Sequence, residues 1–403
     1  MPRNYLIIGL KYIHVERVEE FSSGRVLVRG RFKGRKLCPH CKSSRVHSQG
    51  WRKRRLKHSR MGNRIVEVHL KVRKLKCQAC LRQGMQRVPH VLARRRSTEN
   101  YRMEVYEQHL GGVSQKHLSR THKISGSTVE RWFWDFLRYK MHELKDRSCP
   151  TVLGIDEHFF TRKKGYATTF VDLKTHRVFD VALGRSQLAL EPYLKQLPGR
   201  ERVRVVLMDL SASYRAIVQK YFPQAQIVAD RFHVVRLISH HFQKLWGQID
   251  PHGKRNRGLL NLFRSKRENL RPDQRENFAR YLAKFPALKV LDQIQQRLLT
   301  LARTKHINKH RARELIPEYL KLVEELKTCG FPELQGLGRT LETWAEEIVR
   351  MWRFTKTNSI TEGLHCHMEM ISRRAFGFRN FQNYRLRVIT LCGHHGLFNR
   401  IDL

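Results

Sequence analysis

Residues 203–214 read VRVVLMDLSASY, an apolar run that ends in Asp209 and leads into a segment with helical spacing. The runs TVLGIDEHFF (151–160) and QIVAD (226–230) have the same form, because in each an aspartate follows apolar residues. Strands that are covered on both faces are apolar at nearly every position. The three runs therefore predict buried strands of an α/β sheet.

Two further strands with alternating character lie between the first of these runs in the chain and the second. They are GYATTFVDLK (165–174) and RVFDVALG (177–184), joined by a short turn, and a helical segment (188–197) follows them. The resulting order is strand, strand, strand, helix, strand, helix, strand. This is the order of a ribonuclease-H-like α/β sheet, and residues 231–357, which are mostly helical and strongly charged, interrupt the domain.

This order predicts that Asp156 and Asp209 lie at the carboxyl ends of two strands, where such a sheet opens to a ligand. Two carboxylates that are brought together repel each other unless a cation lies between them. Hard oxygen ligands select Mg²⁺ or Mn²⁺ over zinc, and a two-metal site, which suits phosphodiester cleavage, needs a further carboxylate. The alternative for Asp209 is that it only caps the following helix.

The charge of the chain indicates the class of partner. Its 403 residues include 80 Lys and Arg against 35 Asp and Glu, a formal net charge of +45, and 40% are hydrophobic, which is enough for folded cores. Such a surface attracts nucleic acid and argues against an enzyme of neutral metabolites. Residues 1–100 hold 27 basic and 5 acidic side chains, so this quarter is the first candidate for contacts with phosphates, although a single basic run is often only a solvated face.

Two Cys-x-x-Cys pairs lie inside this basic region, Cys38 with Cys41 and Cys77 with Cys80. Each pair can place two thiolates on one ion from a tight turn, and four sulfurs satisfy tetrahedral Zn²⁺. VEVHLKVRKLKC (66–77) alternates like a strand, so the segment predicts a knuckle, a basic hairpin and a second knuckle. Four thiolates leave no open position, which favours structural zinc, and the alternative is two unrelated or redox-active cysteine pairs.

Other cysteines and histidines do not have this spacing. The remaining cysteines are Cys149, Cys329, Cys366 and Cys392. Histidines and a cysteine near the C-terminus could suggest a second metal site. Because their spacing is helical, we expect them to be ordinary packing positions: His365, Cys366, His367, His394 and His395.

Residues 99–140 predict three helices. Tyr101–Leu110 has helical apolar spacing, two glycines end it, and a second helix, the turn KISGS and the segment TVERWFWDFLRYK follow. This is a helix-turn-helix pattern, with Ser127–Lys140 as the candidate recognition helix. Val129, Trp132, Phe133 and Phe136 would face inward, and Ser127, Thr128, Glu130 and Arg131 would face a DNA groove. The alternative is a three-helix bundle that serves only packing.

These motifs together resemble the ISL3 family of bacterial insertion-sequence transposases, over nearly the whole chain. The similar segments are CPHC…CQAC, the helix-turn-helix, GIDEHFF (154–160), and residues 206–236 and 357–388. The resemblance implies a DDE recombinase with a ribonuclease-H-like core, a helical insertion before the final glutamate, and the catalytic triad Asp156, Asp209 and Glu362. Ser359 and Glu362 also fit a capping box, which gives the glutamate a structural alternative.

The resemblance also assigns supporting residues. Asp230 and His233, in ADRFH, are similar to a D-x-x-H element that supports the site, and the alternative for His233 is a packing or surface position. Arg373, Arg374 and Arg379 are candidates for binding the scissile phosphates, although arginines at a helix end are commonly partners of the helix dipole.

The family implies an enzyme that binds the terminal inverted repeats of a mobile element, cleaves DNA to free a 3′-hydroxyl and joins it to target DNA. The expected cofactors are Mg²⁺ or Mn²⁺ at the triad and Zn²⁺ at the four cysteines. The expected partner is double-stranded DNA, with a homodimer or larger synaptic complex to hold two ends. Two alternatives remain open at this point, a zinc-containing transcriptional regulator without catalysis and a nuclease of the ribonuclease-H fold.

Three segments follow from these assignments. Residues 1–97 form the basic zinc module, 98–147 the helix-turn-helix domain, and 148–403 the catalytic domain with its helical insertion at about 245–350. The chain has no run of about 18 apolar residues and no secretory signal, so we expect no membrane partner and a cytoplasmic, nucleoid-associated protein.

Overall fold

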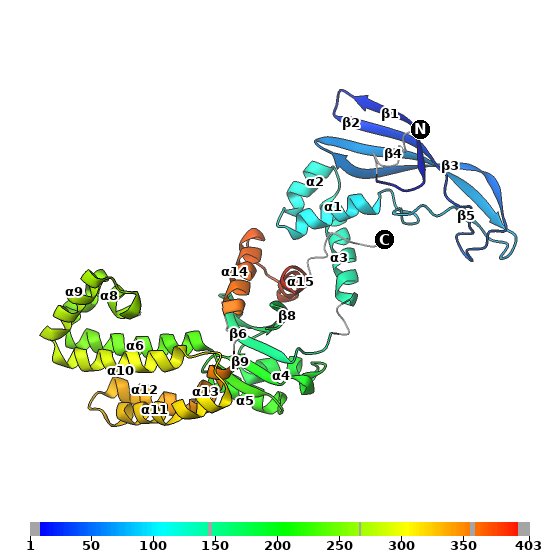
Figure 1. Ribbon diagram of the computed structural model, residues 1–403. Coiled ribbons are helices and arrows are strands. Elements are labelled where there is room, and N and C mark those ends of the chain that lie inside the picture. Colours follow the sequence, from blue (N-terminus) through cyan, green and yellow to red (C-terminus); the bar gives the residue numbers. More distant parts are fainter. Residues whose placement is uncertain (1–8, 144–146, 266, 355–358, 394–403) are drawn as a thin grey trace. The chain divides into compact units, whose positions relative to one another are not determined.

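The computed structural model describes residues 9–143, 147–265, 267–354 and 359–393. The chain divides into two compact units. Of the described residues, the N-terminal unit contains 9–143 and 371–377. The second unit contains 147–265, 267–354, 359–370 and 378–393, and it is called the catalytic unit after the activity that the resemblance implies for this segment. Figure 1 shows the elements of each unit.

The N-terminal unit begins with a twisted sheet. Its strands are β1 (Ile13–Phe21), β2 (Arg25–Phe32), β3 (Val46–Met61), β4 (Arg64–Cys77) and β5 (Gln83–Met85). The order is β1-β2-β4-β3, with β5 paired to β4, and only β2 and β4 run parallel. Val66, Val68, Leu70 and Val72 alternate along β4 and are fully buried, so the predicted strand before the second cysteine pair, and the predicted hairpin, are confirmed.

Three helices follow the sheet: α1 (Glu99–Leu110), α2 (Gln115–His122) and α3 (Gly126–Glu143). The side chains of Thr98 and Ser114 cap α1 and α2, and Ser125 accepts a hydrogen bond from the Thr128 backbone at the start of α3. The α2–α3 turn passes through Lys123, whose φ of 49° is left-handed. The four residues predicted to face inward from the third helix are all buried: Val129, Trp132, Phe133 and Phe136.

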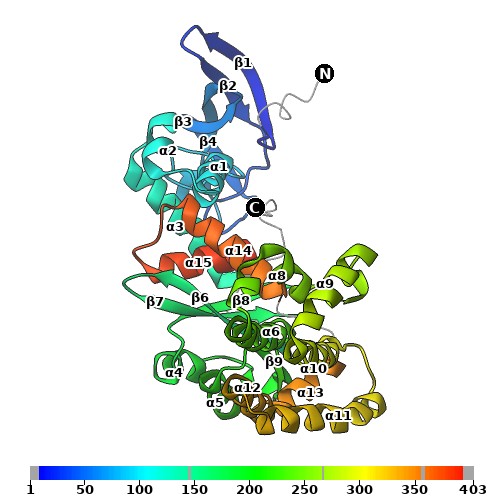
Figure 2. The same cartoon turned by 90° about the vertical axis from the view of Figure 1, so that its left-hand side faces the viewer.

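The catalytic unit is built on a second sheet. Its elements are β6 (Val152–Thr161), β7 (Gly165–Asp172), β8 (Arg177–Leu183), α4 (Gln187–Lys195), β9 (Val205–Met208), α5 (Ala212–Tyr221) and β10 (Gln226–Ala229). The strand order is β10-β9-β6-β7-β8, in which β9 runs parallel to both neighbours and β7 antiparallel to both. The predicted succession of strands and helices is therefore confirmed. Helices α4 and α5 lie on one face, and α14 (Ser359–Arg374) and α15 (Phe381–Cys392) on the other (Figures 1 and 2).

The prediction that Asp156 ends its strand is wrong. Strand β6 continues to Thr161 because β7 pairs with it along almost its whole length, whereas β9 pairs only with residues 152–155. Ile155 is opposite Met208, the last residue of β9. Asp156 therefore lies in the middle of its own strand and still at the level where the parallel neighbour ends.

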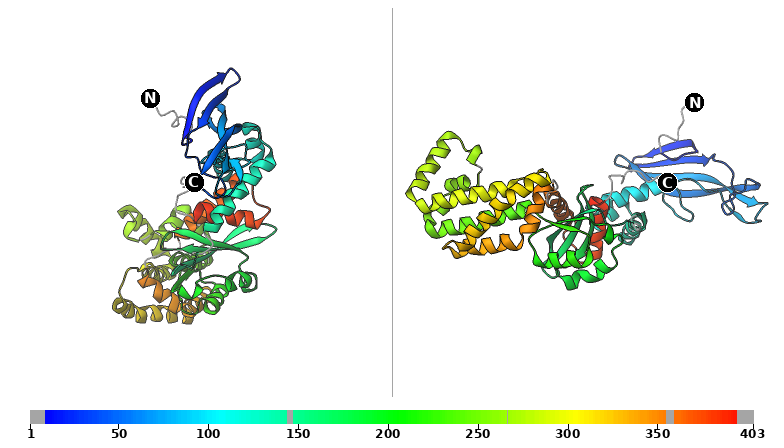
Figure 3. Two further views of the ribbon diagram at one scale, coloured as in Figure 1. Left: turned by 90° about the vertical axis from the view of Figure 1, so that its right-hand side faces the viewer. Right: turned by 60° about the horizontal axis from the view of Figure 1, so that its bottom comes forward.

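The helical part of the catalytic unit starts directly after β10. It comprises α6 (Arg231–Ile249), α7 (Pro251–Arg255), α8 (Arg257–Arg264), α9 (Pro272–Lys284), α10 (Pro286–Arg303), α11 (Lys309–Thr328), α12 (Pro332–Thr343) and α13 (Ala345–Arg353). These helices extend to one side of the sheet (Figure 3). One apolar cluster runs from the sheet into them and includes the buried Trp246 and Trp352. Within the described ranges, no helix is long and apolar enough to cross a membrane.

Helix α15 is held against the sheet by a forked ion pair. The guanidinium of Arg385 donates to both carboxylate oxygens of Asp180 on β8, at 2.7 and 2.6 Å. Asp180 is buried, and its hydrogen bonds to Arg385 raise the pKa of the arginine. This geometry is bidentate, which is the strongest form of such a pair.

Replacing Arg385 by alanine leaves the Asp180 carboxylate buried without its partner. We expect the free energy of unfolding of the catalytic unit to fall by roughly 3 kcal/mol. Thermal or urea unfolding measures this loss. Arg280→Ala, which removes an exposed arginine of α9, is the matched control and should change stability by less than about 0.5 kcal/mol. Equal effects of the two substitutions would contradict the assignment.

Candidate functional site

Asp209 is the first residue after β9 and stands at the carboxyl edge of the sheet. The helix that follows does not use it as a cap. Ser211 is the N-cap of α5, and its hydroxyl accepts the hydrogen bond from the backbone of Tyr214 at 3.4 Å. The alternative that Asp209 only caps a helix is therefore wrong, and its carboxylate is available for another role.

Asp209, Asp230 and His233 form a compact group of possible ligands. One ligand atom from each lies within 4.8 Å of the other two. The ring Nδ1 of His233 is 3.0 Å from Oδ2 of Asp209. Asp230 is fully buried and caps α6, because its side chain accepts a hydrogen bond from the backbone N–H of His233 at 3.4 Å. The two residues of the D-x-x-H element thus lie beside Asp209, and His233 is partly buried.

The other carboxylate oxygen of Asp209, Oδ1, is buried and has no hydrogen-bond partner among the described residues. Burial raises the pKa of Asp209 to about 8, and the negative charges of Asp156 and Asp230 add to this effect. An anionic carboxylate in this position is therefore unfavourable unless a cation is near. An unpaired buried oxygen among like charges fits a divalent cation site.

Asp156 lies at the same level of the neighbouring strand and is also buried. Its Oδ1 accepts a hydrogen bond from the backbone of Glu157 at 2.8 Å, and its Oδ2 is 3.8 Å from Nδ1 of His365 on α14. Its charge is the largest among those that raise the pKa of Asp209. Asp156 is nevertheless not a member of the group within 4.8 Å.

A chain of side chains continues from His365 into the unit. Thr169 Oγ1 lies 3.0 Å from His365 Nε2 and 2.9 Å from His158 Nδ1, and the Tyr384 hydroxyl lies 2.9 Å from His158 Nε2. Burial lowers the pKa of His365 to about 4 and that of His158 to about 3, so both rings are neutral near pH 7. When the Tyr384 hydroxyl donates to Nε2 of His158, Nδ1–H of His158 can donate to Thr169, and the Thr169 hydroxyl to Nε2 of His365. The N–H of His365 Nδ1 then faces Asp156.

Glu362 is in the first turn of α14 and is exposed. Helix α14 begins at Ser359 itself, and the position before it lies outside the described residues, as do the predicted packing positions His394 and His395. Glu362 is not in the group within 4.8 Å, but its charge reaches that group. Burial lowers the pKa of His233, and the charges of Asp230 and Glu362 oppose this shift.

The predicted DNA-binding residues are on the surface of their elements. Ser127 and Arg131 are exposed and Thr128 is partly exposed, all in the first turns of α3. Arg373 and Arg374 are exposed in the last turn of α14, and Arg379 is exposed between α14 and α15.

The four predicted cysteine ligands come together in the N-terminal unit. The sulfurs of all four lie within 4.8 Å of one another, with Cys38 Sγ 3.6 Å from Cys80 Sγ and Cys41 Sγ 3.6 Å from Cys77 Sγ. Each sulfur therefore has its near neighbour in the other Cys-x-x-Cys pair. This interleaving is the arrangement of a tetrahedral four-thiolate site and excludes two unrelated pairs.

The thiols of this cluster cannot all ionise without a cation. The backbone N–H of Cys41 lowers the pKa of Cys38 to about 6, against the opposing effect of burial. The backbone N–H of Ser43 lowers the pKa of Cys41, but loss of hydration and the neighbouring thiols raise it to about 12. Bound Zn²⁺ removes this conflict because it stabilises every thiolate.

Comparison with known proteins decides the family. A family model described as a transposase of the ISL3 type matches residues 153–388, more than half of the chain. The chain belongs to the ISL3 transposase family. A second model, the zinc finger of transposases of the IS204/IS1001/IS1096/IS1165 type, matches residues 35–80 and covers all four cysteines. The four-cysteine cluster is thus a zinc-ribbon site, and this family membership identifies the chain as a DNA transposase that cleaves DNA and transfers strands.

Two curated proteins are similar to this ISL3 transposase. The transposase for insertion sequence element IS1001 of Bordetella parapertussis is 25% identical over 331 residues, which are 80% of each chain. A protein of Lactococcus lactis subsp. lactis named an ATP-dependent protease is 24% identical over 197 residues, 45% of this chain and 57% of that protein. The first similarity agrees with the family over most of the chain, whereas the second covers less than half of it.

The sequence did not reveal the series of side chains that leads from Tyr384 to His365, next to Asp156 in this transposase. Its pattern indicates an ordinary packing position for His365 and does not single out Thr169, His158 or Tyr384. The alternation of β7 indicates that Thr169 faces one side of the sheet, but its two histidine partners are separated from it by 11 and 196 positions. Only the fold brings them together.

The raised pKa of Asp209 gives a pH dependence with a defined sign. Between its ordinary value of 3.8 and about 8, the folded protein holds a proton that the unfolded chain releases, so stability falls as pH rises through this range. We expect Asp209→Asn to raise the melting temperature at pH 8, with zinc bound and no other divalent ion, and to have a much smaller effect at pH 4. A gain of the same size at both pH values would contradict the assignment.

The zinc ribbon can be tested by its metal content. Cys38→Ser and Cys77→Ser each remove one ligand, so we expect zinc bound per chain to fall from about one ion to well below one. Elemental analysis of the purified variants measures this. Cys329→Ser, which changes a cysteine of the catalytic unit, is the matched control and should leave the zinc content unchanged. Full zinc in both ribbon variants would show that these thiols are not ligands.

Proposed function

We propose that Asp156, Asp209 and Glu362 form the catalytic triad of this transposase, on a ribonuclease-H-like core. The reaction frees a 3′-hydroxyl at the element end by hydrolysis of one phosphodiester. That hydroxyl then attacks a phosphodiester of target DNA and displaces the target's own 3′-oxygen. The observation that carries the proposal is the buried, unpartnered Oδ1 of Asp209 beside two other carboxylates.

The donor set fits Mg²⁺ or Mn²⁺, because carboxylate oxygens are the ligands these ions prefer. Asp156, Asp209 and Glu362 would hold the ions. When bound, the ions supply activation of the attacking oxygen and stabilisation of the leaving oxygen. The aspartates come from the sheet, whereas Glu362 comes from helix α14. The position of α14 therefore determines whether all three carboxylates lie together.

Asp230 and His233 act as supporting residues in this proposal. The ring Nδ1 of His233 lies 3.0 Å from Oδ2 of Asp209, close enough to hold this oxygen, and Oδ1 has no hydrogen-bond partner among the described residues. Asp230 fixes the first turn of α6, and with it the position of His233. His365 lies near Asp156 at a longer distance, because its Nδ1 is 3.8 Å from Oδ2 of that carboxylate, beyond hydrogen-bond length.

The N-terminal unit binds double-stranded DNA in this proposal, at the terminal inverted repeats. Helices α2 and α3, with the left-handed turn at Lys123, act as a helix-turn-helix. Its exposed residues Ser127 and Arg131 and the partly exposed Thr128 reach the major groove. The zinc ribbon presents the basic hairpin β3–β4 beside it. Arg373, Arg374 and Arg379 are proposed to contact phosphates near the cleaved bond.

Two element ends must be held together for strand transfer, so we propose a homodimer or larger synaptic complex on DNA. A cytoplasmic, nucleoid-associated location agrees with the net charge of +45 and with a DNA substrate.

Substitutions of the proposed triad test catalysis directly. We expect Asp156→Asn, Asp209→Asn and Glu362→Gln each to lower the rate of end cleavage and strand transfer by roughly 10²–10³-fold, because each removes a charge that stabilises the reacting centre. The assay is a strand-transfer reaction with Mg²⁺ and DNA that carries the inverted repeats flanking the gene. Glu157→Gln is the matched control, since Glu157 adjoins Asp156 but pairs with Arg185 on the surface. If all three triad variants keep their activity, the triad is wrong.

A further inference from the structure

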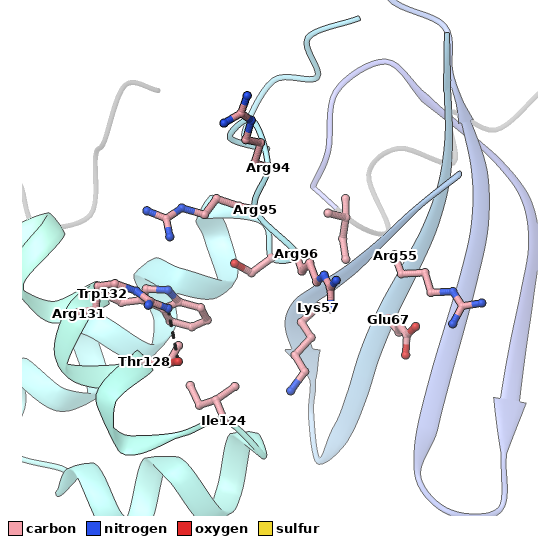
Figure 4. A pocket seen from close by; sticks show the side chains of 12 residues that line it. Arg55, Lys57, Glu67, Arg94, Arg95, Arg96, Ile124, Thr128, Arg131 and Trp132 are labelled. Atoms are coloured by element: carbon pink, nitrogen blue, oxygen red, sulfur yellow. Dashed lines mark hydrogen bonds between the residues drawn. The ribbon is translucent and has the colours of Figure 1, made fainter. Parts of the chain in front are cut away.

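A cationic cavity lies inside the N-terminal unit, apart from the four cysteines and from the carboxylate group. Its volume is about 460 Å³, within the range of about 300–1,000 Å³ that is usual for ligand sites. Three segments line it: the hairpin β3–β4, the connection at residues 94–97, and α3 with the turn before it (Figure 4). Six of the lining side chains are basic: Arg55, Lys57, Arg94, Arg95, Arg96 and Arg131.

The positive charge of this cavity is not balanced from within. Among the described residues, Glu67 is the one acid that lines it, and Glu67 is already paired with Arg25 and with His69, the latter at 2.7 Å. Four of the arginines have no carboxylate within 4.0 Å in the described part of the chain: Arg55, Arg94, Arg96 and Arg131. Cations gathered in this way attract an anion from outside.

The walls of the cavity are held together by hydrogen bonds. The backbone N–H of Lys57 donates to Arg96 at 2.9 Å, and the backbone N–H of Thr98 donates back to Lys57 at 3.0 Å, so the connection runs along β3 like a short extra strand. The ammonium of Lys57 donates to the backbone carbonyl of Lys123 in the α2–α3 turn at 2.7 Å. The hairpin, the connection and the turn before α3 are therefore positioned before any ligand arrives.

The cavity also has an apolar side. Leu56 and Trp132 are buried, and Ile124 is partly buried, all among the lining residues. Apolar walls lower the local dielectric, which strengthens the attraction between the cations and a bound anion. Burial accordingly lowers the pKa of Lys57.

We propose that this cavity binds a phosphodiester group of duplex DNA, beside the groove that α3 enters. The inference rests on the proposed role of α3 as the recognition helix. Arg131 and Thr128 belong both to the exposed start of α3 and to the cavity, so a duplex that contacts this helix brings its backbone to the cavity. Contacts with phosphate fix the register of a protein on DNA without reading bases. The cavity thus joins the zinc hairpin and the recognition helix into one binding surface.

The test measures binding alone, with the full-length zinc-loaded protein and no other divalent ion. The probe is a labelled DNA duplex of arbitrary sequence, titrated at several salt concentrations. We expect Arg96→Gln and Arg131→Gln each to weaken binding roughly three- to tenfold, and the double variant to lower the slope of log K against log salt by about 1, as for one lost phosphate contact. Arg280→Gln, which removes an exposed arginine of the catalytic unit, is the matched control for net charge and should change neither quantity.

Several outcomes would overturn the proposal. One is duplex binding by the double variant that equals the control, while its zinc content is that of the wild type. A second is binding of inorganic phosphate to the cavity with no effect on duplex affinity, which would indicate a site for free phosphate. A third is loss of single-stranded RNA binding with duplex binding intact, which would assign the cavity to RNA.

Failure of this inference and failure of the proposed catalytic function can be distinguished. Duplex binding is measured without the divalent ion and without cleavage, so its result does not depend on the triad assignment. If the triad is wrong but the cavity binds DNA, the Arg96 and Arg131 variants still lose affinity. If the cavity does not bind DNA, the Arg96 and Arg131 variants keep wild-type affinity, and this result does not depend on how the triad variants affect cleavage.

Discussion

The arrangement of the catalytic unit depends on a partly buried carboxylate that has negative neighbours. Asp209 lies at the end of β9, with Asp156 on one adjacent strand and Asp230 after the other, and burial together with their charges raises its pKa to about 8. Three parallel strands impose this proximity, because β9 and β10 end at the same level and Asp156 lies on β6 at that level, although β6 itself continues to Thr161. A proton or a divalent cation can neutralise the charge of this carboxylate. In the proposed triad the cation takes this place, so the cost of the partly buried charge is part of the proposed function.

The remaining elements control how this edge is completed. Helix α14 carries Glu362 in its first turn and His365 one turn later, where the imidazole faces Asp156 and Thr169. Tyr384 of α15 continues the same chain through His158, and Arg385 of α15 is fixed to Asp180. The contacts that pack α14 and α15 on the sheet thus also set the position of Glu362, the third residue of the proposed triad.

Much of this could be predicted from the sequence, because the decisive patterns are local. Apolar runs that end in aspartates identify the parallel strands, and Cys-x-x-Cys spacing identifies the zinc ligands. The position of Asp156 within its strand could not be predicted, because it depends on how far β7 pairs with β6. The cap of α5 at Ser211, two residues after Asp209, was also missed. The role of His365 and the cationic cavity arise from residues far apart in the chain, which no local pattern connects.

The central claim is that Asp209 exchanges its proton for a divalent cation. Calorimetric titration of Mg²⁺ or Mn²⁺ into the zinc-loaded protein at pH 7, repeated in buffers with different ionisation enthalpies, measures both the binding and the proton released. If the carboxylates form the metal site, the wild type binds the ion with release of up to about one proton per chain, and Asp209→Asn loses both the binding and the release. Binding of the same strength by Asp209→Asn, or binding by the wild type without any proton release, would contradict it.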